Sequence, residues 1–119
     1  MAGKKIDVKK NLELKKLLTI GALANDARLE RVDNRYKVIG DPTEGALVTL
    51  AYKGNMAKEE LDNRYPRVGE IPFDSNRKMM TTFHKNYLPG KIVSFTKGAP
   101  DIVLDKCSHI CIDGKLVEL

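Results

Sequence analysis

The chain has 119 residues, of which 42% are hydrophobic and 31% charged, a composition typical of one soluble globular domain. No apolar run approaches the roughly 20 residues that a membrane-spanning helix needs. The formal net charge of +5 raises nucleic-acid binding as a possibility, but the lysines gather near the N-terminus and the other cations alternate with acidic residues. We therefore expect a solvated surface, a polar, basic and frayed start over residues 1–10, and no nucleic acid as a partner.

Local patterns predict helices and hairpins along the chain. Leucines at helical spacing predict an amphipathic first helix. Asp33-Asn34 and Asp113-Gly114 each separate two β-like runs, which is typical of tight hairpin turns. In chain order, the expected elements are a helix over 11–24, a hairpin of 29–32 with 36–39, a helix that begins at 41–42 and stops at Gly54, a helix over 56–64, an extended segment over 65–71, a hairpin of 78–84 with 91–96, a helix over 100–105, and a hairpin of 110–112 with 115–117.

These elements predict the fold class. Strands that follow one another through hairpins form antiparallel sheets, and no regular alternation of strand and helix predicts a parallel one. We therefore expect an α+β fold in which an antiparallel β-sheet is flanked by helices, with residues 11–119 forming the domain.

Cys107, His109 and Cys111 are the residues that most resemble a metal-binding cluster. Two thiols and one imidazole are too few for the usual four zinc ligands, and the Cys-x-x-Cys spacing is missing. We expect reduced thiols and no metal site.

Residues 40–47, Gly-Asp-Pro-Thr-Glu-Gly-Ala-Leu, allow two interpretations. Asp41 can cap a helix, and Glu44, three residues later, can complete a pair that resembles a capping box. Alternatively, the Glu44 carboxylate can accept a hydrogen bond from an exocyclic amine such as that of adenine. The local pattern leaves both interpretations open.

Residues 71–80, Ile-Pro-Phe-Asp-Ser-Asn-Arg-Lys-Met-Met, are also ambiguous. In one interpretation Phe73 is a core residue, and Arg77 and Lys78 are solvated cations. In the other, Phe73 exposes its ring to stack on a nucleobase, an interaction worth about 1–3 kcal/mol, and Lys78 faces the phosphates.

Residues 97–101, Lys-Gly-Ala-Pro-Asp, follow a β-like run and precede an apolar run, which predicts a turn from strand to helix. Pro100 suits the first helical position. Gly98 can let a ligand approach the backbone beside Lys97, although a simple cap and a strand-end cation explain the pattern equally well. Because the chain has no P-loop and no Gly-x-Gly-x-x-Gly, a bound nucleotide would be held by its base.

Together, these segments resemble the nucleotide-binding (N) domain of P-type (E1-E2) cation-transporting ATPases. Residues 40–47 are similar to that family's Gly-Asp/Glu-x-Thr-Glu-x-Ala-Leu motif, residues 72–81 to its Phe-(Asp/Ser)-x-x-x-Lys-x-Met motif, and residues 97–101 to its Lys-Gly-Ala-Pro-Glu/Asp motif. Ala24-Asn25-Asp26-Ala27 resembles the family's Cys-Asn-Asp-Ala, with alanine in place of the cysteine. The combination is most similar to the bacterial calcium pumps of type II.

The resemblance implies that ATP is the ligand, that it is bound by its adenine end, and that the chain contributes no catalytic side chain. The implied roles are stacking on adenine for Phe73, contact with the adenine amino group for Glu44 with Thr43 near it, a place near the phosphates or ribose for Lys78, the pocket mouth for Lys97, close approach of the ring for Gly98, and packing against the base for Met80.

The phosphorylated aspartate of that family lies in Asp-Lys-Thr-Gly-Thr, which this sequence lacks. The resemblance therefore implies an excised part of a larger pump that is inactive alone and uses Mg²⁺ only in the intact protein. There it would present the γ-phosphate of ATP to an aspartate in another domain, with the phosphorylation, actuator and membrane domains as partners. It would be the cytoplasmic domain of an integral membrane protein in a bacterial plasma membrane. The alternative is a basic module that binds nucleic acids or other anions.

Overall fold

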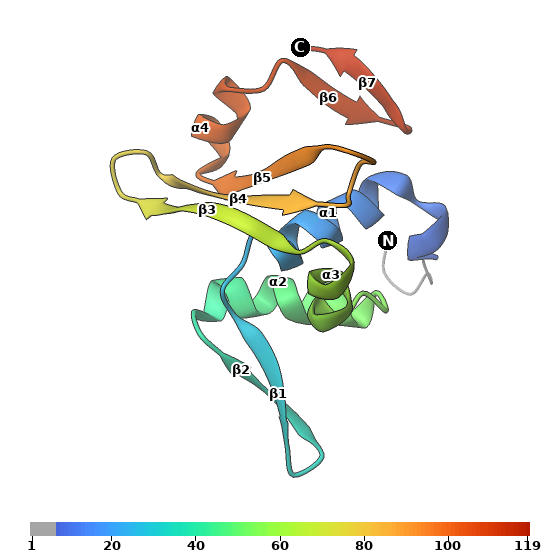
Figure 1. Cartoon of the computed structure of the whole chain (residues 1–119), viewed down its shortest axis with the longest axis vertical. Coiled ribbons are helices and arrows are strands. Elements are labelled where there is room, and N and C mark those ends of the chain that lie inside the picture. The colour runs from blue at the N-terminus through green and yellow to red at the C-terminus, as the bar shows by residue number, and fades with distance from the viewer. Residues whose placement is uncertain (1–6) are drawn as a thin grey trace.

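A computed structural model describes residues 7–119, which form helices around a three-stranded antiparallel sheet (Figure 1). The arrangement confirms the predicted α+β class with antiparallel sheets flanked by helices. Most of the predicted basic start, residues 1–6, lies outside the described residues. The elements are the 3₁₀ helix η1 (Val8–Lys10), α1 (Leu12–Leu23), β1 (Arg28–Val32), β2 (Arg35–Ile39), α2 (Pro42–Lys53), α3 (Lys58–Arg64), β3 (Arg67–Asp74), β4 (Met79–Lys85), β5 (Ile92–Gly98), α4 (Pro100–Asp105), β6 (His109–Ile112) and β7 (Lys115–Glu118).

Side-chain caps define where the two long helices begin. The Asn11 side chain accepts a hydrogen bond from the Leu14 N–H at 3.0 Å and starts α1. Asp41 does the same for the Glu44 N–H at 3.1 Å, and Pro42 occupies the first turn of α2. Gly54 ends α2, as predicted. Local chemistry therefore explains these boundaries without reference to distant residues.

The two outer hairpins turn through residues with positive φ. Asp33 and Asn34 have φ of 50° and 64°, and Asp113 and Gly114 have φ of 50° and 78°. Two-residue turns of this kind match the twist of the strands that they join, so β1 pairs with β2 and β6 with β7 as predicted.

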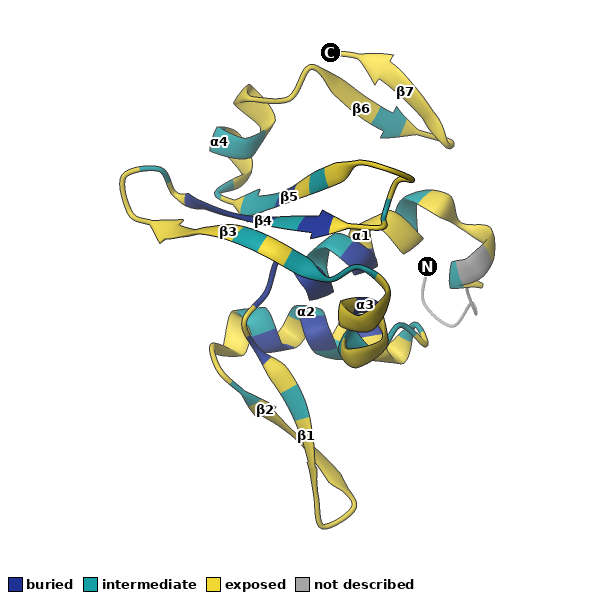
Figure 2. Ribbon diagram, viewed as in Figure 1, coloured by how far each residue is buried: buried dark blue, intermediate teal, exposed yellow. Residues whose placement is uncertain are grey.

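The central sheet has the order β3-β4-β5, and α1, α2 and α3 pack together beside it (Figure 1). Buried residues concentrate on these helices and on β4, whereas the β1–β2 and β6–β7 hairpins at the two ends are mostly exposed (Figure 2). The projecting hairpins explain a radius of gyration of 15.0 Å, which exceeds the roughly 13.5 Å expected for a compact chain of this length. The main core cluster consists of Leu18, Ala22, Leu23, Ala24, Ala51, Leu61 and Phe95.

The predicted and observed boundaries differ by more than one residue in α3, β3 and β5. Helix α3 begins at Lys58 rather than at residue 56. Strand β3 continues through Pro72 and Phe73 to Asp74, and β5 continues to Gly98. Both strands are longer than their local sequence indicates because backbone pairing with β4 extends them.

Candidate functional site

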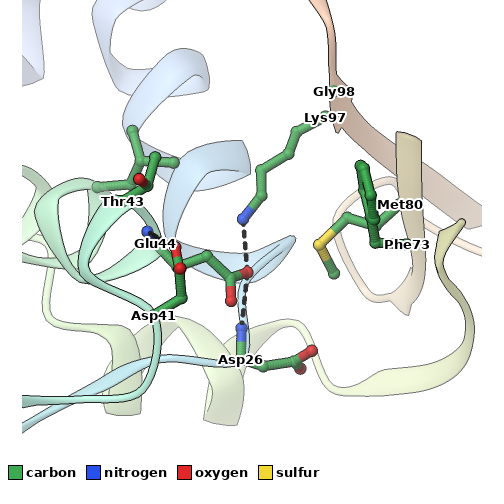
Figure 3. Close-up of a pocket in the computed structure, with 9 residues that line it drawn as sticks. Asp26, Asp41, Thr43, Glu44, Phe73, Met80, Lys97 and Gly98 are labelled. Carbon is green, nitrogen blue, oxygen red and sulfur yellow. Dashed lines mark hydrogen bonds and ion pairs between the residues drawn. The ribbon is translucent and has the colours of Figure 1, made fainter. Parts of the chain in front are cut away.

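A pocket of about 670 Å³ opens between the start of α2 and one end of the central sheet (Figure 3). This volume is in the range of small-molecule binding sites. Two sides of the pocket come from different parts of the fold, and we call them the helix wall and the sheet wall. The helix wall consists of Asp26, Asp41, Thr43, Glu44 and Leu47, and the sheet wall consists of Phe73, Met80, Lys97 and Gly98.

The Glu44 carboxylate faces the pocket instead of completing the cap of its own helix. Its Oε2 accepts hydrogen bonds from the Asp26 N–H at 3.2 Å and from Lys97 Nζ at 2.7 Å. Asp41 caps α2 as predicted, but Glu44 does not accept the return hydrogen bond of a capping box, so that half of the prediction is wrong. Instead, the Asp26 N–H and Lys97 bind the Glu44 carboxylate. Its place in the first turn of α2 also favours a negative charge.

The ion pair between Glu44 and Lys97 joins the two walls across the pocket (Figure 3). The two side chains are 20% and 24% exposed, respectively. Partial burial lowers the effective dielectric constant around such a pair, so it is less screened by salt than a surface pair. The pair also places a cation and a carboxylate side by side at the point where a polar edge of a ligand could enter.

Phe73 lies on a β-bulge that exposes its ring. Ile71 pairs with Thr81 and Asp74 pairs with Met79, so Pro72 and Phe73 together lie opposite Met80 alone. β3 is an edge strand, where the missing N–H of proline is tolerated. Phe73 is 63% exposed, so the interpretation as a core residue is wrong. An exposed aromatic ring above a buried methionine forms an apolar surface on the sheet wall.

Arg77 supports the turn that follows Phe73. Its guanidinium donates to the carbonyls of Ile71 and Met79 at 3.3 and 3.0 Å and to Thr81 Oγ1 at 3.3 Å. The interpretation of Arg77 as a solvated cation is therefore wrong, because three acceptors near the bulge hold it. Lys78 does match that interpretation, since its side chain is exposed.

Gly98 lies at the end of β5 rather than in a turn after the strand, and the same holds for Lys97. A Cβ on Gly98 would come within 2.2 Å of the Lys78 carbonyl oxygen and within 2.8 Å of the Met79 Cα. Lys78 has φ of 57°, and its carbonyl accepts a hydrogen bond from the Ala99 N–H at 3.1 Å. The backbone at the start of β4 thus leaves no room for a side chain at position 98. This is a second reason for a glycine here, in addition to the predicted close approach of a ligand.

The pocket brings together six of the seven residues that the sequence predicted, and Lys78 is the exception. Lys78 lies in the turn between β3 and β4, outside the lining. Three lining residues were not predicted as site residues. Asp41 and Leu47 were seen only as parts of a helix, although both belong to the Gly40–Leu47 segment, and Asp26 had only the Asn-Asp-Ala resemblance as a signal.

Cys107 and Cys111 are free, as the sequence led us to expect, and each lies outside the pocket lining. Over residues 7–119, no three or more His, Cys, Asp or Glu side chains are grouped so that they could hold a metal ion. In the same part of the chain, no helix has the length and apolar character needed to cross a bilayer.

Comparison with known proteins shows what the chain resembles. Residues 13–119 match the family described as P-type ATPase, cytoplasmic domain N. The chain is 43% identical over 111 residues to a calcium-transporting ATPase of Bacillus subtilis, and 39% identical over 101 residues to a calcium-transporting ATPase of Listeria monocytogenes. It is 38% identical over 112 residues to a probable cation-transporting ATPase F of Mycobacterium tuberculosis. These alignments cover 93%, 85% and 93% of this chain but only 12%, 11% and 12% of the relatives.

Proposed function

The chain belongs to the family of P-type ATPase cytoplasmic N domains, and we propose that it binds ATP by the adenine end in the pocket between the helix wall and the sheet wall. Its relatives carry the names of calcium- and cation-transporting ATPases. We accordingly propose that it serves as the nucleotide-binding part of such a pump, on the cytoplasmic side of a bacterial plasma membrane, with calcium as the transported ion.

The exposed ring of Phe73 is the observation that carries this proposal. A bulge in β3 turns the ring toward the pocket, where 63% of its surface is exposed, while Met80 lines the pocket beside it. Stacking of a base on an aromatic ring is worth about 1–3 kcal/mol and needs such an open ring face. Removing Phe73 should therefore weaken binding without disturbing the core.

Glu44 supplies a polar contact for the edge of the base. Both hydrogen bonds of its carboxylate within the described residues use Oε2, so Oε1 is left to accept a hydrogen bond from the amino group of adenine. Thr43 lies next to it in the first turn of α2. Lys97 already donates to the same carboxylate and would neutralise part of its charge beside the base.

In the intact pump, the chain would act by positioning rather than by chemistry. Lys78 is exposed in the turn after Phe73, where it could reach the ribose or the phosphates of a bound nucleotide. The phosphorylation domain would then receive the γ-phosphate on its aspartate, and Mg²⁺ would act in that assembly. Closure of one domain on another is a common way to bring reactants together. The isolated chain would bind ATP without hydrolysing it.

Isothermal titration of the chain with ATP tests this proposal. Phe73→Ala should weaken binding by about ten- to a hundredfold, the loss of one stacked base. Its free energy of unfolding should change by less than about 0.5 kcal/mol, because the ring is mostly exposed. Tyr36→Ala removes another exposed aromatic ring, outside the pocket, and serves as the matched control.

The proposal is wrong if the folded chain does not bind ATP, or if Phe73→Ala binds it as tightly as the unmodified chain. Repeating the titration at higher salt separates base stacking from binding to a phosphate backbone. Binding through phosphates weakens steeply as salt increases, whereas stacking does so less.

A further inference from the structure

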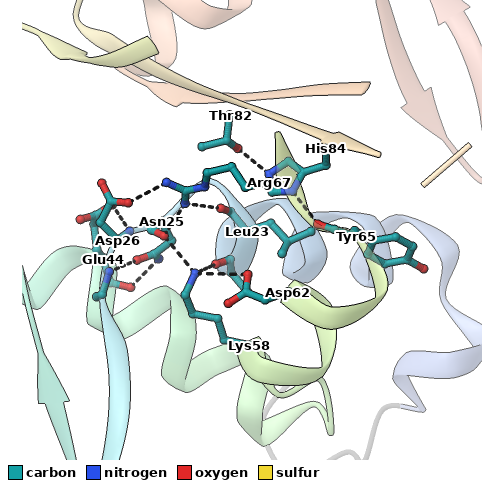
Figure 4. A network of polar contacts seen from close by, with 12 residues as sticks. Leu23, Asn25, Asp26, Glu44, Lys58, Asp62, Tyr65, Arg67, Thr82 and His84 are labelled. Atoms are coloured by element: carbon teal, nitrogen blue, oxygen red, sulfur yellow. Dashed lines mark hydrogen bonds and ion pairs between the residues drawn. The ribbon is translucent and has the colours of Figure 1, made fainter. Parts of the chain in front are cut away.

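We propose that Arg67 is a positioning residue that orients the Glu44 carboxylate and thereby gives the pocket its preference for a 6-amino purine over a 6-oxo purine. The inference rests on the proposed binding of ATP but concerns a side chain that does not line the pocket. Arg67 is the first residue of β3, and Glu44 lies in the first turn of α2. The two residues are connected through the turn that follows α1 (Figure 4).

The Arg67 guanidinium holds this turn at three points. Nη1 donates to Asp26 Oδ1 at 2.9 Å, and Nη2 donates to the carbonyls of Leu23 and Asn25 at 3.0 and 2.9 Å. A weaker contact of 3.5 Å joins Nη1 to Glu70. The planar guanidinium can satisfy several acceptors at fixed angles, which a single ammonium group cannot do.

The turn is held so firmly because α1 would otherwise end in unpaired carbonyls. The last four carbonyls of a helix have no partner within it. Here the Ala24 N–H, the Asn25 amide, Lys58 and Arg67 each donate to one of them in sequence order, from Ile20 to Leu23. Two cations at this end also match the negative pole of the helix dipole.

This turn also holds Glu44 at two positions. The Asn25 amide donates to the Glu44 carbonyl at 2.8 Å, and the Asp26 N–H donates to Glu44 Oε2 at 3.2 Å. Arg67 binds both the Asp26 carboxylate and the Asn25 carbonyl. It therefore positions the peptide between Asn25 and Asp26, whose N–H holds the Glu44 carboxylate. Lys58 donates to the same Asn25 carbonyl at 2.9 Å and so supports the same peptide, but only Arg67 also binds the Asp26 carboxylate among the hydrogen bonds of the described residues.

A fixed carboxylate distinguishes purines by the group at position 6. An amino group donates a hydrogen bond to Glu44 Oε1, whereas an oxo group points a second acceptor at the carboxylate. A polar group left without a partner in a binding site weakens affinity. If Glu44 loses its orientation, ATP loses its hydrogen bond while inosine triphosphate loses nothing, so the two affinities approach each other.

The test compares the dissociation constants of ATP and inosine triphosphate for the same chain by calorimetry. We expect the unmodified chain to prefer ATP by about fivefold or more, the value of one hydrogen bond. Arg67→Met should reduce that preference severalfold. Arg64→Met is the matched control, because Arg64 contacts the Tyr65 ring and no pocket residue among those described.

The ratio of the two affinities distinguishes positioning from general stability. A loss of stability alone lowers both affinities together. The inference is overturned if the unmodified chain shows no preference, if Arg67→Met keeps it, or if Arg64→Met reduces it equally. Arg67→Lys is judged by the same criterion if circular dichroism shows that Arg67→Met does not fold. An unmodified chain that binds neither nucleotide overturns the proposed function, and this inference with it.

Discussion

The helix wall and the sheet wall of the pocket are held in place by different interactions. On the helix wall, side chains bind backbone groups: Asn25 is fully buried and fixes both the end of α1 and the start of α2. On the sheet wall, backbone pairing sets the positions, since Met80 pairs with Lys97 and Met79 with Gly98. The helix wall is therefore most sensitive to the loss of a polar side chain, whereas the sheet wall is most sensitive to the addition of a side chain at a glycine.

This difference has a physical basis. A helix end must find partners for its last carbonyls, and in this fold those partners are side chains from distant segments. A strand inside a sheet finds its partners in the neighbouring strand, so its side chains are free to face a ligand. We therefore expect substitutions to affect the two walls through different mechanisms.

The largest effect is expected on the helix wall from Asn25→Ala. Asn25 donates to the carbonyls of Gly21 and Glu44 and accepts from the Ala27 N–H, all at 2.8–2.9 Å. Losing the three hydrogen bonds of this fully buried side chain should lower the free energy of unfolding by about 3 kcal/mol, measured by urea denaturation. Asn63→Ala, at an exposed position of α3, is the control and should change it little. A loss below about 1 kcal/mol for Asn25→Ala would show that side chains do not hold this wall.

An intermediate effect is expected on the sheet wall from Gly98→Ala. The added Cβ would meet the backbone of Lys78 and Met79, which cannot move without disturbing β4. The free energy of unfolding should fall by about 2 kcal/mol. Gly69→Ala, in β3 of the same sheet, places its Cβ 3.5 Å from the Phe83 ring, an ordinary contact, and should be nearly neutral. Equal losses of stability for both variants would contradict the special role of Gly98, because any side chain added in the sheet would then destabilise the fold.

The smallest effect is expected from acid, acting through His84. This histidine is fully buried in β4, and its ring nitrogens bind the Tyr65 carbonyl at 2.7 Å and Thr82 Oγ1 at 2.8 Å. Burial lowers its pKa below the ordinary value of 6.5, and the nearby Arg67 charge acts in the same direction. As the pH falls, His84 therefore takes up a proton in the unfolded chain at a higher pH than in the folded chain. The resulting contribution to stability is fully present above about pH 6.5 and is lost as the pH falls toward the folded-state pKa.

Urea denaturation at about pH 7.5 and about pH 5.5 measures this contribution. The unmodified chain should be less stable at the lower pH, and His84→Gln should flatten the difference even if it lowers stability at both values. His109→Gln is the matched control, because His109 is the other histidine and is exposed. A difference that His84→Gln leaves intact would assign the acid sensitivity to other groups.

Much of the fold could be predicted because its boundaries depend on neighbours in sequence. The Asp41 cap, the Pro100 start of α4 and the Asp113-Gly114 turn use contacts within a few residues. The site motifs around Glu44, Phe73 and Lys97 were likewise visible as segments. The lengths of β3 and β5 were not, because pairing with β4 extends both strands beyond their local signal.

The sequence by itself determined the α+β class, the order of the elements, the family and six of the residues that line the pocket. Only the tertiary structure decided how these residues face one another. Lys97 reaches Glu44 across 53 residues, and Arg67 reaches Asp26 across 41. The bulge that exposes Phe73 likewise depends on its pairing with β4. Short-range hydrogen bonds and backbone preferences are encoded locally, whereas the partner of a carboxylate or a carbonyl depends on which distant segment the core brings beside it.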